Sequence, residues 1–175
     1  MQKFIIKVTT EDLKAIEDKL IECFVLDSSM PQDFIKSFAL KASIKDKITL
    51  IMGEKAPALC NDLNADGVII DLSKSEKIKK EINDIKKQIP GKILGIITRN
   101  RRHEAMLVSE EEPDFVIFKI WKDGFEKVGE LVSWYNEFFL IQSAVLCEEE
   151  INTSTLKADM IILPDVFYKN LLAKK

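Results

Sequence analysis

Eight short apolar runs, each followed by a polar or amphipathic segment, extend along the whole chain. Three of them begin with nearly the same phrase, ADGVIID at 65–71, PDFVIFK at 113–119 and ADMIILPD at 158–165. The runs are continuous rather than alternating, which is typical of strands buried on both faces of a parallel sheet. Unbroken alternation of such strands with helical segments predicts parallel strands joined by right-handed crossovers. This alternation constrains the fold more than any other feature.

The pattern predicts eight strand–helix units. The expected strands are residues 4–8, 23–26, 48–52, 67–72, 93–97, 115–120, 138–141 and 160–163. The expected helices are residues 11–21, 31–42, 56–63, 75–88, 102–109, 125–135, 148–156 and 166–172. In the fourth helix, Ile78, Ile82 and Ile85 form one apolar stripe, which favours an amphipathic helix packed on a sheet.

Eight such units can close into a barrel, which removes both edges of the sheet. We therefore predict an α/β fold, a compact (β/α)8 TIM barrel, formed by residues 1–175 as a single domain. The chain of 175 residues is shorter than the usual ~200 of this architecture, so the loops must be short. An open, doubly wound sheet is the competing fold.

The repeated phrase also predicts roles for its acidic residues. Asp66, Asp114 and Asp159 each follow a helix and open a strand at its amino-terminal end. In a TIM barrel this end serves stability, whereas catalysis belongs to the carboxyl-terminal end. We expect the three side chains to bond to backbone groups of the local turn and to be structural.

Composition excludes several classes of function. The net charge is −3 and the lysine pairs have acidic neighbours, which argues against a nucleic-acid partner. No apolar run reaches the roughly 18–20 residues of a membrane span, and the start of the chain lacks a signal-peptide pattern, so we expect a cytoplasmic protein without a membrane partner. Cys23, Cys60 and Cys147 form no CxxC pair, which favours buried free thiols over disulfides or zinc ligands.

A family resemblance spans about two thirds of the chain, from Ile48 to Phe167. The segment ITLIMGEKAPALCNDLNADGVIIDL resembles a segment of thiamine-phosphate synthase and its TenI relatives, in which an Asn-Asp-Arg motif follows the third strand. KILGIITRNRRHEA, EPDFVIFKIW and LKADMIILPDVF are similar to later segments of that family. The resemblance implies a TIM barrel that handles a phosphorylated thiazole or pyrimidine in thiamine metabolism, as a synthase-like transferase or a tautomerase-like isomerase.

The resemblance also implies site residues. The family's Asn-Asp-Arg falls on Gly53-Glu54-Lys55, so Glu54 would bind Mg²⁺ and Lys55 the phosphate. Asp71 is a second, weaker metal candidate. The other implied phosphate ligands, on loops after the later strands, are Thr98, Arg99, Lys119 and Ser143.

Several motif residues of the family are replaced, which leaves other functions open. Its positive charge after the second strand becomes Asp27, and its glycines near the seventh strand become the run QSAVL at 142–146, whose Cβ atoms obstruct a close phosphate approach. One alternative is a catalytically inactive barrel with a binding or regulatory role. Another is an aldol-type barrel that uses Lys119 as its reactive amine. Trp134, Tyr135, Phe138 and Phe139 also mark a candidate homodimer contact.

Overall fold

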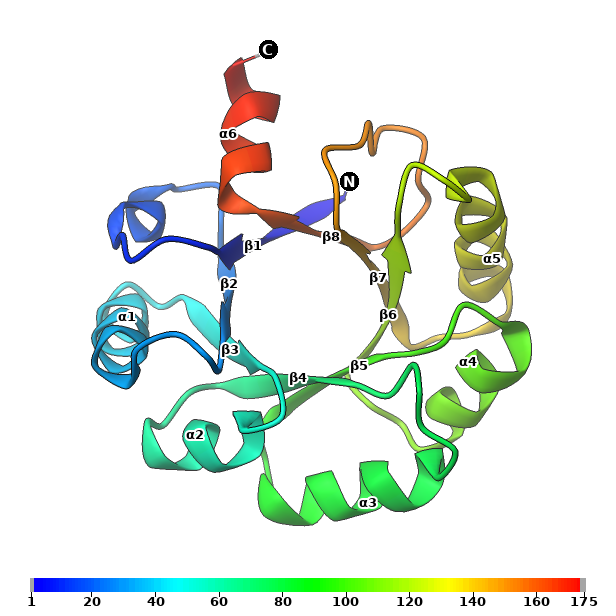
Figure 1. The fold of residues 1–175 in the computed structure, drawn as a ribbon, viewed down its shortest axis with the longest axis horizontal. Helices are drawn as coiled ribbons and strands as arrows, with labels where there is room; N and C mark the ends of the chain where they lie inside the picture. Colours follow the sequence, from blue (N-terminus) through cyan, green and yellow to red (C-terminus); the bar gives the residue numbers. More distant parts are fainter. Residues whose placement is uncertain (1, 174–175) are drawn as a thin grey trace.

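The computed structural model describes residues 2–173, and these form a closed barrel of parallel strands (Figure 1). Each strand pairs with the next along the chain, and β8 pairs with β1, so the ring has no edge. The strands are β1 Lys3–Val8, β2 Cys23–Asp27, β3 Ile48–Met52, β4 Gly67–Asp71, β5 Ile93–Ile97, β6 Phe115–Ile120, β7 Gln142–Cys147 and β8 Met160–Pro164. The prediction of a TIM barrel is confirmed, and the open sheet is excluded.

Helices surround the barrel, but two of the predicted ones are missing. Those present are α1 Gln32–Ile44, α2 Ala56–Asp62, α3 Ile78–Gln88, α4 Arg102–Glu110, α5 Phe125–Phe138 and α6 Asp165–Ala173. Between β1 and β2, where residues 11–21 were expected to be helical, there is only the short 3-10 helix η1 Lys14–Glu17. The predicted helix at 148–156 is wrong, because these residues form turns and irregular chain.

The predicted seventh strand at 138–141 is also wrong. Its apolar run, Phe138-Phe139-Leu140-Ile141, ends α5 and forms the turn that follows, and Leu140 is fully exposed. The strand begins four residues later than predicted, at Gln142, and its first two residues are polar. Helix α5 continues three residues beyond its predicted end because Val128, Leu131, Val132 and Tyr135 bury one face of it against the barrel.

The strands contribute side chains to two separate apolar cores. An outer core lies between the barrel and the helices, and an inner core fills the barrel. Gly95 of β5 leaves room for the ring of Phe115 on β6, because a Cβ atom on Gly95 would overlap that ring. The inner core comprises Ile5, Val25, Leu50, Ile69, Ile97, Phe115, Ile117, Ala144, Leu146 and Ile162. The barrel interior is therefore a packed core rather than a channel.

The aspartates of the repeated phrase lie at the amino-terminal end of the barrel. Oδ2 of Asp66, Asp114 and Asp159 accepts a hydrogen bond from a backbone N–H of the preceding strand, 2.7–2.9 Å away. A structural role is therefore confirmed. The partners differ from the prediction, because these bonds join neighbouring strands instead of closing a local turn.

Candidate functional site

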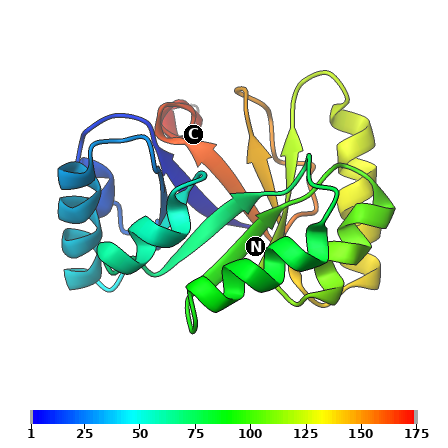
Figure 2. The ribbon, with the colours of Figure 1, turned by 60° about the horizontal axis from the view of Figure 1, so that its bottom comes forward.

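The carboxyl-terminal ends of the strands form the face shown in Figure 1, toward which the strand arrows of Figure 2 rise. Side chains alternate along a strand, so a residue two places beyond an inner-core residue also points into the barrel. By this rule the last inward-facing position carries a charged side chain on four strands. These residues are Lys7 on β1, Asp27 on β2, Asp71 on β4 and Lys119 on β6. Together they line the mouth of the barrel above the apolar core.

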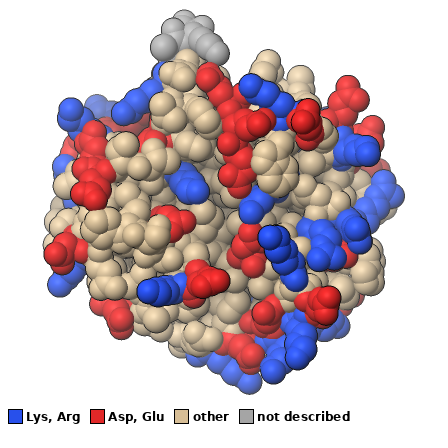
Figure 3. Space-filling view, viewed as in Figure 1, with Lys and Arg blue, Asp and Glu red and all other residues tan. Residues whose placement is uncertain are grey.

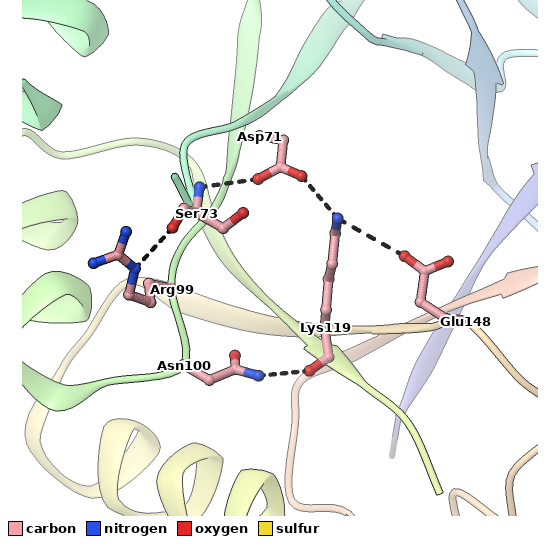
Figure 4. Close-up of polar contacts among 6 residues, drawn as sticks. All are labelled: Asp71, Ser73, Arg99, Asn100, Lys119 and Glu148. Carbon is pink, nitrogen blue, oxygen red and sulfur yellow. Dashed lines mark hydrogen bonds and ion pairs between the residues drawn. The ribbon is translucent and has the colours of Figure 1, made fainter. Parts of the chain in front are cut away.

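Lys119 lies between two carboxylates at this mouth (Figure 4). Its Nζ donates to Oδ2 of Asp71 at 2.7 Å and lies 3.9 Å from Oε1 of Glu148, which directly follows β7. Its side chain is one quarter exposed, so it can be reached from solvent. The main chain at the same residue is fixed, because Nδ2 of Asn100 donates to the Lys119 carbonyl at 2.9 Å.

A chain of polar contacts positions Asp71. Its Oδ1 accepts from the backbone N–H of Ser73 at 2.9 Å, and the Ser73 carbonyl accepts from Nε of Arg99 at 2.9 Å. Partial burial of Asp71 acts to raise its pKa, but the hydrogen bonds from Lys119 and Ser73 outweigh burial and hold the pKa below its ordinary value. Asp71 is therefore ionised near neutral pH, and its negative charge faces the Lys119 ammonium group.

The predicted anion ligands after β5 have other partners. Arg99 donates to the Ser73 carbonyl, and its guanidinium lies 3.7 Å from Glu104 of α4. Thr98 is buried and its hydroxyl donates to the Arg99 carbonyl at 3.2 Å. These contacts hold the loops after β4 and β5 in place. Arg99 nonetheless keeps its positive charge on the same side of the molecule as Lys119.

Glu54 and Lys55 lie together on the exposed turn that starts α2. Within residues 2–173 no group of three or more His, Cys, Asp or Glu side chains could hold a metal ion. Asp71, the second metal candidate, is instead bound to Lys119. The residues present do not fit the Mg²⁺ that the resemblance implies, so we assign no step to it.

Ser143 lies at the wrong end of the barrel to bind phosphate at the mouth. It is the second residue of β7, is fully buried, and donates through Oγ to Oδ1 of Asn136 at 2.6 Å. The expectation that it follows the seventh strand fails because that strand begins at Gln142. The residues that do follow β7 at the mouth are Glu148 and its acidic neighbours, which had been assigned to a helix.

Lys7 also lines the mouth of the barrel, although it was not among the site residues predicted from the sequence. It is half-buried, and within the described part of the chain it makes no hydrogen bond or ion pair through its ammonium group. The signal was its alternation with Ile5, which belongs to the inner core. Figure 3 shows Lys and Arg mixed with Asp and Glu over the whole face, so the mouth has no uniformly cationic surface.

Neither the thiols nor the two hollows described for residues 2–173 belong to this mouth. Burial raises the pKa of Cys23 and Cys147 to about 12 and raises that of Cys60, so all three are inert thiols near neutral pH. One hollow lies along the outside of α5, and the other surrounds Lys3, Gln142 and Asp159 at the amino-terminal end.

Comparisons with known proteins identify the fold alone. No protein-family model and no curated protein matches the sequence. Among solved structures, the citrate synthase SbnG has 13% identity and a TM-score of 0.59, covering 99% of this chain and 91% of that one. The 3-hexulose-6-phosphate synthase of Salmonella typhimurium has 17% identity and a TM-score of 0.62, covering 93% and 89%. A protein of Aquifex aeolicus VF5 has 13% identity and a TM-score of 0.68, covering 99% and 88%.

These similarities show the TIM-barrel fold and no particular reaction, since one fold hosts many activities. The resemblance to thiamine-phosphate synthase stays a prediction. Among the described residues, no helix combines the length and apolar character needed to cross a membrane.

Proposed function

We propose that the mouth of the barrel binds a small carbonyl compound with an anionic group, and that Lys119 reacts with the carbonyl carbon. The observation that carries this proposal is the position of the Lys119 amine, at the end of the apolar core and between the carboxylates of Asp71 and Glu148. An amine so placed can form a covalent intermediate, and adjacent carboxylates can move the protons that the reaction requires. Lys7, which has no partner among the described residues, is the candidate to bind the anionic group.

The proposed step needs no oxidant and no metal. Asp71 takes one proton from the Lys119 ammonium group, and the free amine then attacks the carbonyl carbon to form a carbon–nitrogen bond. The carbonyl oxygen takes up the nitrogen-bound proton to become a hydroxyl, which receives the proton held by Asp71 and departs as water. The products are a protonated imine on Lys119 and one water molecule. This imine withdraws electrons from the adjacent carbon, so Glu148 can remove a proton there, as in aldol-type and dehydration reactions.

Reductive trapping tests the proposal. The full chain is incubated with pyruvate or with dihydroxyacetone phosphate, treated with sodium borohydride, and analysed by intact mass and peptide mapping. We expect one adduct, located on Lys119, that is absent from Lys119→Met. Asp71→Asn should slow its formation by roughly tenfold or more, since carboxylate proton transfer is lost.

Lys3→Met is the matched control, because Lys3 lies on a barrel strand at the opposite end. It should retain the Lys119 adduct. An adduct spread over surface lysines, or no adduct with either compound, would refute the assignment of Lys119 as the reactive amine.

A phosphorylated thiazole or pyrimidine, the ligand class implied by the family resemblance, is the second candidate. The observation that favours it is again the ammonium group of Lys7, which has no partner within residues 2–173 and could serve as a phosphate ligand. Calorimetric titration with thiazole phosphate, thiamine phosphate and pyrophosphate, with and without Mg²⁺, separates the candidates. Binding that Lys7→Met abolishes and Lys119→Met retains would support this function. If borohydride traps no adduct and the titrations detect no binding, the catalytically inactive barrel is the remaining alternative.

A further inference from the structure

A groove runs along the exposed face of α5. It has a volume of about 450 Å³. Its α5 side is one face of the helix and includes the polar residues Glu126, Glu130, Ser133 and Glu137, three or four residues apart, together with Gly129. Thr155 and Leu156 border it from the β7–β8 connection. The groove exists because that connection forms no helix in the described chain, so only a thin segment reaches the edge of α5 (Figure 1).

The groove is acidic and has an apolar floor. Glu126, Glu130 and Glu137 are exposed, and within residues 2–173 none of them makes a hydrogen bond or ion pair. Phe125, Trp134 and Leu156 supply apolar surface between them, and Arg102 lies over the Trp134 ring at 5.0 Å. Three unneutralised carboxylates beside apolar surface favour a cationic, amphipathic occupant.

The outer face of α1 has these complementary properties. Leu40 and Ile44, one turn apart, are 64% and 74% exposed, and Lys36 lies one turn before Leu40. Lys41 and Lys45 share the single carboxylate of Glu17, at 3.2 and 3.5 Å, which leaves this flank with an excess of positive charge. Asp33 is the acidic residue at the start of the same face. This face of α1 is therefore apolar and cationic, which complements the acidic groove with its apolar floor.

We propose that α1 of one molecule docks into the α5 groove of a second molecule. The helices have 13 and 14 residues, each about 20 Å long, so their faces match in length. Pairing α1 with α1 would oppose lysines, and pairing α5 with α5 would oppose glutamates. Only the unlike pairing neutralises both faces while it buries Leu40 and Ile44.

The position of the helices determines the form of the assembly. α1 and α5 lie on opposite sides of the barrel, so α1 cannot dock into the α5 groove of its own molecule (Figure 1). A contact between unlike faces leaves one free α1 and one free groove, and therefore continues beyond a dimer unless it closes into a ring. One helix in one groove buries less than the about 800 Å² per partner of a standard interface, so the association should be weak. This inference is independent of the chemistry at the mouth.

Sedimentation velocity of the full chain tests this inference between about 10 µM and 1 mM, the range of weak protein contacts. We expect the average mass to rise past that of a dimer with concentration and to fall with added salt. Lys36→Glu and Glu130→Lys should each return the protein to a monomer. The double variant carrying both reversals should associate again, because it restores the unlike pairing.

Lys87→Glu on the exposed face of α3 is the control, with the same charge change outside both faces. It should leave association unchanged, and thermal melting verifies that each variant folds. A monomer throughout the concentration range would overturn the inference. So would a dimer that Leu40→Asp abolishes and Glu130→Lys leaves intact, because that outcome identifies a symmetric α1 contact.

Discussion

At the scale of single residues, the repeated aspartates explain why one phrase occurs three times. Asp66, Asp114 and Asp159 open β4, β6 and β8, and each carboxylate accepts a backbone N–H from the odd-numbered strand before it. The backbone carbonyls of Asp66 and Asp159 also accept from the strand that follows, at Ile93 and Lys3. Each of these two aspartates therefore ties three strands together at the amino-terminal end of the barrel.

Asp114→Ala tests this role at the residue scale. Hydrogen bonds to a charged group contribute about 1.5–3 kcal/mol, and here the loss also leaves the Leu94 N–H without its acceptor. We expect the free energy of unfolding in urea to fall by that amount. Asp123→Ala, at an exposed position without a hydrogen bond in the described chain, should change it by less than about 0.5 kcal/mol. Equal effects of the two substitutions would contradict a structural role for Asp114.

At the scale of elements, sequence patterns predicted most strands because both faces of each are buried. They failed where the apolar run does not coincide with the strand. Phe138 and Leu140 are apolar but exposed, whereas Gln142 and Ser143 are polar and begin β7. The helix predicted at 148–156 fails for a similar reason, since its buried residues, Thr153 and Leu156, do not continue into a stripe of helical period.

Packing between strands gives a prediction at the element scale. Gly95→Ala places a methyl group against the ring of Phe115, and overpacking of this kind costs about 1–3 kcal/mol. Phe115→Leu removes the ring, so the double variant should be less destabilised than the sum of the two single variants. Gly129→Ala is the control in α5, where the new Cβ meets Leu156 at an ordinary 3.9 Å and the helix should gain about 0.5–1 kcal/mol. If the destabilisation of the double variant equals the sum of the two single variants, the Phe115 ring is not what excludes a Cβ atom at Gly95.

At the scale of the whole molecule, the candidate site depends on which strands become neighbours, and this limits its prediction from sequence. Lys119 was a site candidate through the family resemblance and as the reactive amine of the aldol-type alternative. Its partners, Asp71 and Glu148, come from other segments and meet it only after the ring closes. Lys7 was overlooked because β1 lies far from Lys119 in sequence, and Ser143 was placed at the mouth because the bounds of β7 were misjudged.

Closure of the barrel also predicts how the thiols behave. Cys60 and Cys147 are buried in the outer core, whereas Cys23 is only partly buried beside the inner core. Burial raises the pKa of each thiol, to about 12 for Cys23 and Cys147, so thiolate is scarce at pH 8 in the folded chain. We expect Ellman's reagent to label Cys60 and Cys147 at a single rate equal to that of global unfolding. Fast labelling of Cys60 or Cys147 in native buffer would contradict this prediction.

The apolar filling beneath Lys119 fixes how deep any bound molecule can go. Ile69, Ile117 and Leu146 occupy the level below the amine, so a ligand of the proposed kind would lie above this apolar layer with its far end in bulk water. The protein would then contact only the few ligand atoms nearest the Lys119 amine. Under the proposed reaction, compounds that share those atoms and differ only in their tails should form the Lys119 adduct almost equally well.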